Sequence, residues 1–99
     1  MLNYLVELIG TFFFLSVILS QGQAIPIGMA LAVAIYFGGS ISGGHFNPAV
    51  TVMKMMDSST NMTDGTIYII AQVIGGLLAL QFYKFSKKWK YKLKYKLEI

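Results

Sequence analysis

The sequence of 99 residues contains no cysteine, only two prolines and little charge. Without cysteine the chain has no disulfide, no thiolate metal ligand and no thiol nucleophile. Charged residues make up 12% of the chain, where a soluble globular chain has roughly 25%, and hydrophobic residues make up 56%. A chain this short has too little interior to bury so much apolar surface. The composition therefore excludes a disordered chain and a soluble enzyme, and it predicts a membrane protein.

The few charges are unevenly distributed along the chain. Glu7 is the only charged residue in the segment 1–53, whereas the segment 84–99 contains seven of the eight lysines. The net charge of +4 therefore belongs to a C-terminal tail, and it does not indicate a surface that binds nucleic acid.

Three apolar segments predict transmembrane helices. A helix needs about 17 to 20 apolar residues to cross the hydrocarbon core of a bilayer. They are residues 4–20, 25–39 and 66–83. A cleaved signal peptide is the alternative for the first segment, but it would need basic residues at its start, and nothing before Glu7 is charged. We therefore expect an integral membrane protein that crosses the bilayer three times.

Small and polar residues in these segments predict where helices meet. Tyr68, Gln72, Gly75 and Ala79 share one face of the third helix, and such a face usually contacts protein while leucine and isoleucine contact lipid. The second segment carries four small residues that allow close helix approach: Gly28, Ala30, Ala32 and Ala34.

The segment 40–56 does not fit a plain loop. The glycines and serines between residues 38 and 46 disfavour a helix there. Asn47 and Pro48 then predict a helix start, because Asn is a favoured N-cap and Pro is favoured at the first helical position. The helix predicted over 48–56 is apolar but too short to span. We expect a re-entrant segment, since irregular backbone survives at membrane depth only inside protein or along a wet cavity.

A re-entrant segment of this kind predicts a path for a small neutral molecule. The helix start would point its free amides and positive dipole end into the membrane, and Asn47 would add its amide N–H₂. The backbone of Gly43, Gly44, His45 and Phe46 would display carbonyl acceptors. Such donors and acceptors suit a hydrogen-bonding neutral solute, while the positive end disfavours cations and protons. A plain Asn-Pro helix cap is the alternative.

The chain offers no candidate for catalysis or metal binding. His45 is the only histidine, so a site with several histidines is excluded. No set of nucleophile, base and orienting residue is present, and the methionines of the segment 53–56 are expected to serve packing. We therefore predict no enzyme and no cofactor.

Residues 42–51, SGGHFNPAVT, resemble the first Asn-Pro-Ala loop of the aquaporin and aquaglyceroporin (major intrinsic protein) family. Glu7, Thr11 and Phe12 are similar to the family's first-helix pattern, and the segment 68–75 is similar to its third. The resemblance covers about residues 2–82. It implies an all-α membrane protein with three transmembrane helices plus one re-entrant half-helix, which is half of an aquaporin-like fold in residues 1–83, followed by a basic tail in residues 84–99.

The resemblance also implies a function. It implies a passive channel, or half of one, for water or small neutral solutes such as glycerol. The residues it assigns to the pore are Asn47, Pro48 and Ala49 of the motif and the backbone of Gly43, Gly44, His45 and Phe46. It assigns structural support to Glu7, Thr11 and Gln72. The implied partners are the lipid bilayer and further subunits, as a homo-oligomer or as an assembly with a second half-repeat.

The sequence departs from the family in what it contains of the two inverted repeats. It holds one repeat, without the second Asn-Pro-Ala loop and the arginine that follows it. Ile27 occupies the position where many members carry an aromatic selectivity residue, so a filter for water alone is not expected. The alternative function is a truncated family member without transport of its own, either a fragment or a membrane partner of full-length channels.

Lysines alternate with aromatic and leucine residues from Lys88 to Leu97. Alternation of period two predicts an extended chain and not an amphipathic helix. Close to a membrane, each lysine contributes about 1 kcal/mol of attraction to anionic lipid. An unselected run of residues is the alternative.

The lysines also predict the orientation of the chain in the membrane. In the family's first repeat the N-terminus is cytoplasmic, which would put the segment after the third span outside. Seven lysines follow that span and only Lys54 lies on the other side, and lysine-rich flanks stay cytoplasmic. The lysine count therefore predicts a cytoplasmic C-terminus, inverted relative to the family's first repeat.

Overall fold

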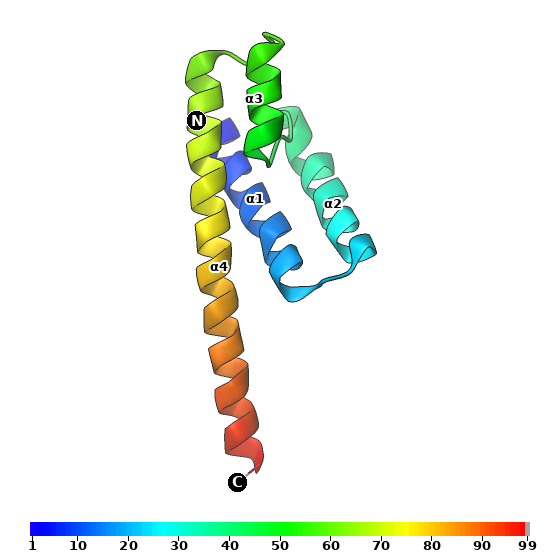
Figure 1. Ribbon diagram of the computed structural model, residues 1–99, viewed down its shortest axis with the longest axis vertical. Helices are drawn as coiled ribbons and strands as arrows, with labels where there is room; N and C mark the ends of the chain where they lie inside the picture. Colours follow the sequence, from blue (N-terminus) through cyan, green and yellow to red (C-terminus); the bar gives the residue numbers. More distant parts are fainter. Residues whose placement is uncertain (99) are drawn as a thin grey trace.

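The computed structural model describes residues 1–98, and these residues form four helices. The helices are α1 (Leu2–Ser20), α2 (Ala24–Ser42), α3 (Pro48–Met56) and α4 (Met62–Glu98). α1 packs against both α2 and α4, and the short α3 packs against α4 (Figure 1). α4 runs on beyond the other helices, so the molecule measures 60 × 25 × 20 Å.

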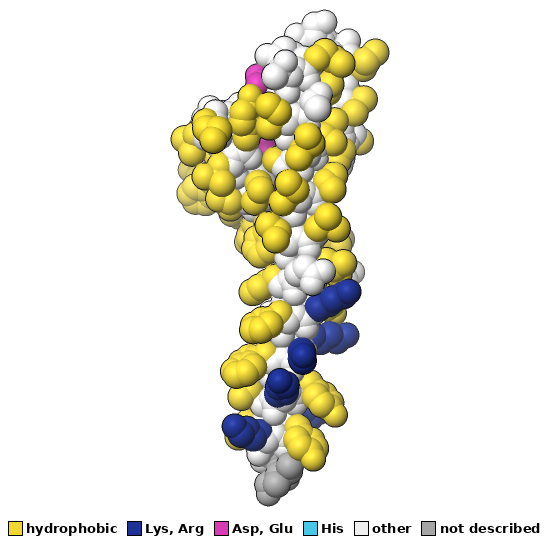
Figure 2. Space-filling model, turned by 90° about the vertical axis from the view of Figure 1, so that its left-hand side faces the viewer, with side chains coloured by type: hydrophobic (Ala, Val, Ile, Leu, Met, Phe, Trp, Pro, Cys, Tyr) yellow, Lys and Arg dark blue, Asp and Glu magenta, His cyan; other side chains and the backbone are white. Residues whose placement is uncertain are grey.

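Among the described residues, α1, α2 and α4 are long and apolar enough to cross a membrane. This confirms the three predicted spans and the all-helical class. Most of the large apolar side chains on these helices are exposed. On the face shown in Figure 2 such side chains cover much of the helical body and continue along α4, where the lysines gather on its C-terminal half. Such a surface suits lipid or further protein, because water would be a poor solvent for it.

The second span ends later than the sequence predicted. Residues 38–42 belong to α2, so the expectation of a broken helix there is wrong. A Cβ at Gly38 would lie 2.7 Å from Cγ1 of Val6, so this glycine allows α1 and α2 to approach. The helix ends instead at Gly43, which has a φ of +90° and takes the left-handed conformation common after a helix.

The third span is longer at both ends than predicted. α4 begins at Met62. Asn61, the residue before it, accepts a hydrogen bond through Oδ1 from the N–H of Asp64 in the first turn, at 2.7 Å. The helix then continues through the lysines to Glu98, so the predicted extended tail is wrong. Extending an existing helix needs no new nucleus, which removes the main cost of forming a helix in this segment.

The faces on which the helices pack were only partly predictable. Tyr68, Gln72, Gly75 and Ala79 are all buried, which confirms the predicted protein-facing side of α4. On α2, however, Ala30 and Ala34 are buried while Gly28 and Ala32 are exposed. Within residues 1–98, two of the four small residues are therefore exposed and do not serve the predicted close packing.

Candidate functional site

A fully buried carboxylate joins α1, α4 and the segment between α2 and α3. Glu7 has an exposed fraction of 0% and accepts four hydrogen bonds. Its Oε2 accepts from the hydroxyl of Ser42 at 2.7 Å and from the His45 N–H at 3.0 Å. Its Oε1 accepts from the Phe46 N–H at 2.8 Å and from Nε2 of Gln72 at 2.9 Å. Backbone amides that have no helical partner are satisfied in this way.

A second set of bonds connects the start of α3 to the same cluster. Nε2 of Gln72 also donates to Oγ1 of Thr51 at 2.8 Å, and Nδ1 of His45 lies 2.9 Å from that oxygen. The hydroxyl of Tyr68 donates to the carbonyl oxygen of Ser42 at 2.6 Å. No sequence pattern predicted a role for Ser42 or Thr51. A signal was nevertheless available for Thr51, because a buried polar side chain in an apolar helix is usually hydrogen-bonded.

The loop backbone takes conformations that glycine favours. Gly43 and Gly44 have φ values of +90° and +66°, and Phe46 has a φ of +53°, which is unusual for a side-chain-bearing residue and costs on the order of 1–3 kcal/mol. The ring of Phe46 is only 2% exposed. It lies on Gly10 of α1, where a Cβ would come within 2.1 Å of the ring. Gly10 thus accommodates the loop, a role that the sequence analysis missed.

Asn47 caps α3. Its Oδ1 accepts a hydrogen bond from the Ala49 N–H at 2.8 Å, and Pro48 is the first helical residue. The predicted helix start and the predicted bounds of 48–56 are confirmed. The cap uses only the oxygen of the carboxamide, so the two N–H donors of Nδ2 take no part in it. Asn47, Pro48 and Ala49 are all exposed.

A cleft of about 590 Å³ lies beside Asn47, between α1, α4 and the loop. Its polar lining residues are Thr11, Asn47 and Gln72, and most of the others are apolar. Oγ1 of Thr11 and Oε1 of Gln72 are buried, and neither has a hydrogen-bond partner among the described residues. These two oxygens are therefore enclosed by protein, and the polar groups exposed at the mainly apolar cleft are the amide donors of Asn47.

Ile27, the expected selectivity residue, does not line this cleft. It lies near the start of α2, fifteen residues of helix before Ser42, which corresponds to roughly 22 Å. The other residues assigned by the resemblance lie together around Glu7 and the N-terminus of α3.

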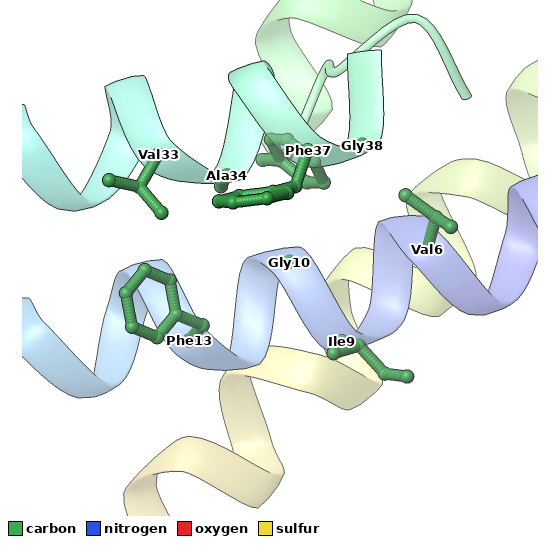
Figure 3. Close-up of a pocket in the computed structure, with 9 residues that line it drawn as sticks. Val6, Ile9, Gly10, Phe13, Val33, Ala34, Phe37 and Gly38 are labelled. Atoms are coloured by element: carbon green, nitrogen blue, oxygen red, sulfur yellow. The ribbon is translucent and has the colours of Figure 1, made fainter. Parts of the chain in front are cut away.

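A second groove, between α1 and α2, is lined by apolar residues. Figure 3 shows Val6, Gly10 and Phe13 of α1 facing Val33 and Phe37 of α2 across it. Its lining side chains are all apolar, so it offers no polar group that would orient a solute. Within the described residues there is also no cluster of three histidine, aspartate or glutamate side chains that would hold a metal ion.

Comparison with known proteins places the chain in a family. The model of the family described as Major intrinsic protein matches residues 18–94. The chain is 41% identical over 88 residues to "Glycerol uptake facilitator protein-like 6" of Lactiplantibacillus plantarum, covering 80% of this chain and 41% of that protein. It is 45% identical over 58 residues to "Aquaporin Z" of Photorhabdus laumondii, covering 59% of this chain and 25% of that protein.

A third relative is the "Glycerol uptake facilitator protein" of Buchnera aphidicola, 46% identical over 48 residues, which are 48% of this chain and 18% of that protein. No solved structure matches the chain significantly. The chain thus spans at most about two fifths of the length of the curated relatives described here. The names of these relatives are those of transport proteins, and none is the name of an enzyme. With a family match over most of its length and three apolar spanning helices, the chain is an integral membrane protein that belongs to the major intrinsic protein family.

Proposed function

We propose that the chain forms half of a passive transmembrane pore for water or small neutral solutes such as glycerol. In this proposal the segment 43–56 is re-entrant, because α3 has only nine residues and is too short to cross a bilayer. The motif residues Asn47, Pro48 and Ala49 then lie at membrane depth. The names of the relatives, which include aquaporins and glycerol uptake facilitators, support this class of solute.

The observation that carries the proposal is the free amide group of Asn47, which is exposed beside the cleft at the N-terminus of α3. Buried oxygens without a partner are rare in proteins and usually bond to water. Two such oxygens, on the lining residues Thr11 and Gln72, are enclosed by protein near the cleft, and the free amide donors of Asn47 are exposed at it. Among the described residues, no hydrogen bond is donated to the carbonyl oxygens of Gly43–Phe46 either. A neutral solute that both donates and accepts fits this lining.

Residues 1–98 alone do not enclose the path. Asn47, Pro48 and Ala49 are exposed, and the cleft beside them is open. We therefore propose that a second half-repeat completes the pore, either another copy in the opposite orientation or a separate chain. Its own Asn-Pro-Ala helix would meet α3 end to end and cover the cleft. The exposed apolar faces of the spans would supply the remaining contacts.

The side chain of Ile27 bears on which solutes the completed pore would admit. An aliphatic side chain in place of an aromatic one leaves a wider and less polar constriction. We propose that the completed pore admits glycerol as well as water.

The test is osmotic swelling of proteoliposomes that contain the purified chain, with water and glycerol gradients measured separately. Asn47→Asp keeps a side-chain oxygen for the helix cap and removes the two N–H donors. It should lower both permeabilities about tenfold or more if those donors line the path. Asn3→Asp, at the start of α1, makes the same chemical change away from the cleft and should leave both unchanged. Permeability no higher than that of empty vesicles would reject a pore built from this chain alone.

The open cleft also favours a second candidate, a subunit without transport of its own that binds a full-length relative. In that case the chain should co-purify with such a relative and alter its permeability, while vesicles with the chain alone stay tight. The two outcomes of the swelling assay separate the candidates.

A further inference from the structure

We propose that the groove between the C-terminal end of α1 and the middle of α4 binds the phosphate of an anionic glycerophospholipid. The groove has a volume of about 640 Å³. Its polar residues are Ser16 and Ser20 of α1 and Ser86, Lys87 and Lys90 of α4. It is separate from the cleft at Asn47, and the inference does not depend on transport.

The two lysines give the groove its charge. Lys87 and Lys90 are three residues apart on a helix and therefore lie on neighbouring positions of one face. No aspartate or glutamate occurs between residues 65 and 97, so α4 carries no acidic side chain beside them over that range. Nζ of Lys87 lies 5.6 Å from the centroid of the Tyr83 ring. The groove is thus a cationic position without a protein counter-charge on its own helix.

The serines add neutral hydrogen-bonding groups to these cations. Oγ of Ser16 is buried and has no hydrogen-bond partner among the described residues. Ser20 bonds only locally, to the carbonyl oxygen of Ser16 at 2.8 Å and to that of Val17 at 3.4 Å. A phosphate diester has several acceptor oxygens and one negative charge, which matches the two ammonium groups, and the Ser20 hydroxyl would join them by rotating away from the α1 carbonyls.

The depth of the groove identifies the source of the phosphate as a lipid. α1 ends at Ser20 and α2 begins at Ala24, so this end of the bundle marks one bilayer surface. Lys87 and Lys90 line the same groove as Ser20 and lie at that level. Toward the membrane interior the groove is lined by Phe12 and Phe82, whose ring centroids are 5.8 Å apart. A headgroup at the lysines would place its acyl chains along these rings, as in basic pockets between transmembrane helices.

Trp89 makes the proposal measurable. It is the only tryptophan of the chain, it is 55% exposed, and it lies between the two lysines in sequence. The experiment places the full chain in phosphatidylcholine nanodiscs and replaces a small fraction of the lipid with brominated phosphatidylglycerol or brominated phosphatidylcholine. Quenching of the Trp89 fluorescence then reports which lipid is held nearby. We expect stronger quenching by the anionic lipid at equal mole fraction.

The variant pair Lys87→Gln and Lys90→Gln should reduce the apparent affinity for phosphatidylglycerol about fivefold for each lysine removed. Lys92→Gln with Lys96→Gln removes the same charge outside the groove, on the part of α4 that runs beyond the other helices, and should reduce it clearly less. Lys87→Arg with Lys90→Arg should retain the preference. Circular dichroism of each variant checks that α4 is still helical.

Three results would overturn the proposal. Equal losses in the two glutamine pairs would show diffuse attraction to the whole tail without a site. Equal quenching by the two brominated lipids would show no preference for the anion. Displacement of the brominated lipid by inorganic phosphate at matched concentration would assign the groove to free phosphate and not to a lipid.

Discussion

Glu7 makes the largest number of side-chain hydrogen bonds to the loop between α2 and α3 and its surroundings. All four of its hydrogen bonds are donated to it, two by backbone amides and two by side chains. A carboxylate suits this position because both of its oxygens only accept. The expected cost of burying it is offset by these four donors, which is the condition under which a charged group survives inside a protein.

Glu7→Gln should therefore loosen the loop without preventing insertion. The amide nitrogen that replaces one oxygen would face two donors, and leaving buried donors unpaired costs on the order of 1–3 kcal/mol. We expect faster hydrogen exchange at the amides of His45 and Phe46, whose N–H groups bond to Glu7.

Asp57→Asn is the matched control. Asp57 is exposed at the end of α3, and its pKa lies below the ordinary value because Ser59 donates its hydroxyl and its N–H to the carboxylate. An asparagine there keeps an acceptor oxygen, so exchange in the loop should not change. Unchanged exchange in Glu7→Gln as well would show that the loop is held by other contacts.

Single residues differ in how far the sequence predicted them. The Asn47 cap and the Pro48 start follow from local preferences, because a cap involves residues two positions apart. The cluster around Glu7 joins residues up to 65 positions apart, so no local pattern specifies which donors meet it. Gly10 was missed for the same reason, since its function is to leave room for the ring of Phe46. Distances of this kind depend on how the helices cross.

At the scale of elements, the contact between α1 and α4 depends on one glycine. A Cβ at Gly75 would lie 2.6 Å from the carbonyl oxygen of Leu8 and 3.2 Å from the backbone nitrogen of Phe12. Both neighbours are backbone atoms and cannot rotate away. The two helices therefore approach here as closely as a glycine permits.

Gly75→Ala should force α1 and α4 apart and destabilise the fold by roughly 1–3 kcal/mol, the usual range for overpacking. The measurement is the thermal unfolding midpoint of the purified chain in detergent. Gly28→Ala is the control, because a Cβ there would meet nothing within 4 Å. Alanine is the better helix former, so this variant should be neutral or slightly more stable. A Gly75→Ala midpoint equal to that of Gly28→Ala would contradict the close contact.

The elements themselves were predictable where composition and period agreed. Three apolar spans and the short helix over 48–56 follow from length and capping signals. The helical end of α2 was not predicted, because its glycines lower helix propensity. Gly38 nevertheless suits the helix, since the absence of a side chain leaves room for Val6 of α1. The tail was misjudged because strict alternation hides a second pattern. Phe85, Trp89, Leu93 and Leu97 recur every four residues and form an apolar stripe once the helix is in place.

At the scale of the whole molecule, the two ends of the bundle differ in charge. One end carries Lys54 in the last turn of α3, and the other carries Lys84 and the six lysines that follow it on the continuous helix α4. Because α4 is straight and unbroken, these lysines stay on the side where α1 ends and α2 begins (Figure 1). The direction in which the bundle inserts into the membrane therefore depends on the charge difference between its two ends. This direction decides which partner could complete a pore.

The lysine asymmetry predicts that the C-terminal half of α4 is cytoplasmic, since basic flanks are retained on that side. Single cysteines can test this in intact cells with a membrane-impermeant maleimide, because the chain has no native cysteine. Tyr95→Cys, at a position 61% exposed, should be protected, and Thr63→Cys, exposed at the other end of α4, should be labelled. Ser86 is less suitable, since it is partly buried in the groove against α1.

Labelling at Tyr95→Cys with protection at Thr63→Cys would overturn the assignment. Partial labelling at both positions would indicate two orientations, which two antiparallel copies need to form a pore. A single orientation would instead require a separate, oppositely inserted half-repeat as the partner.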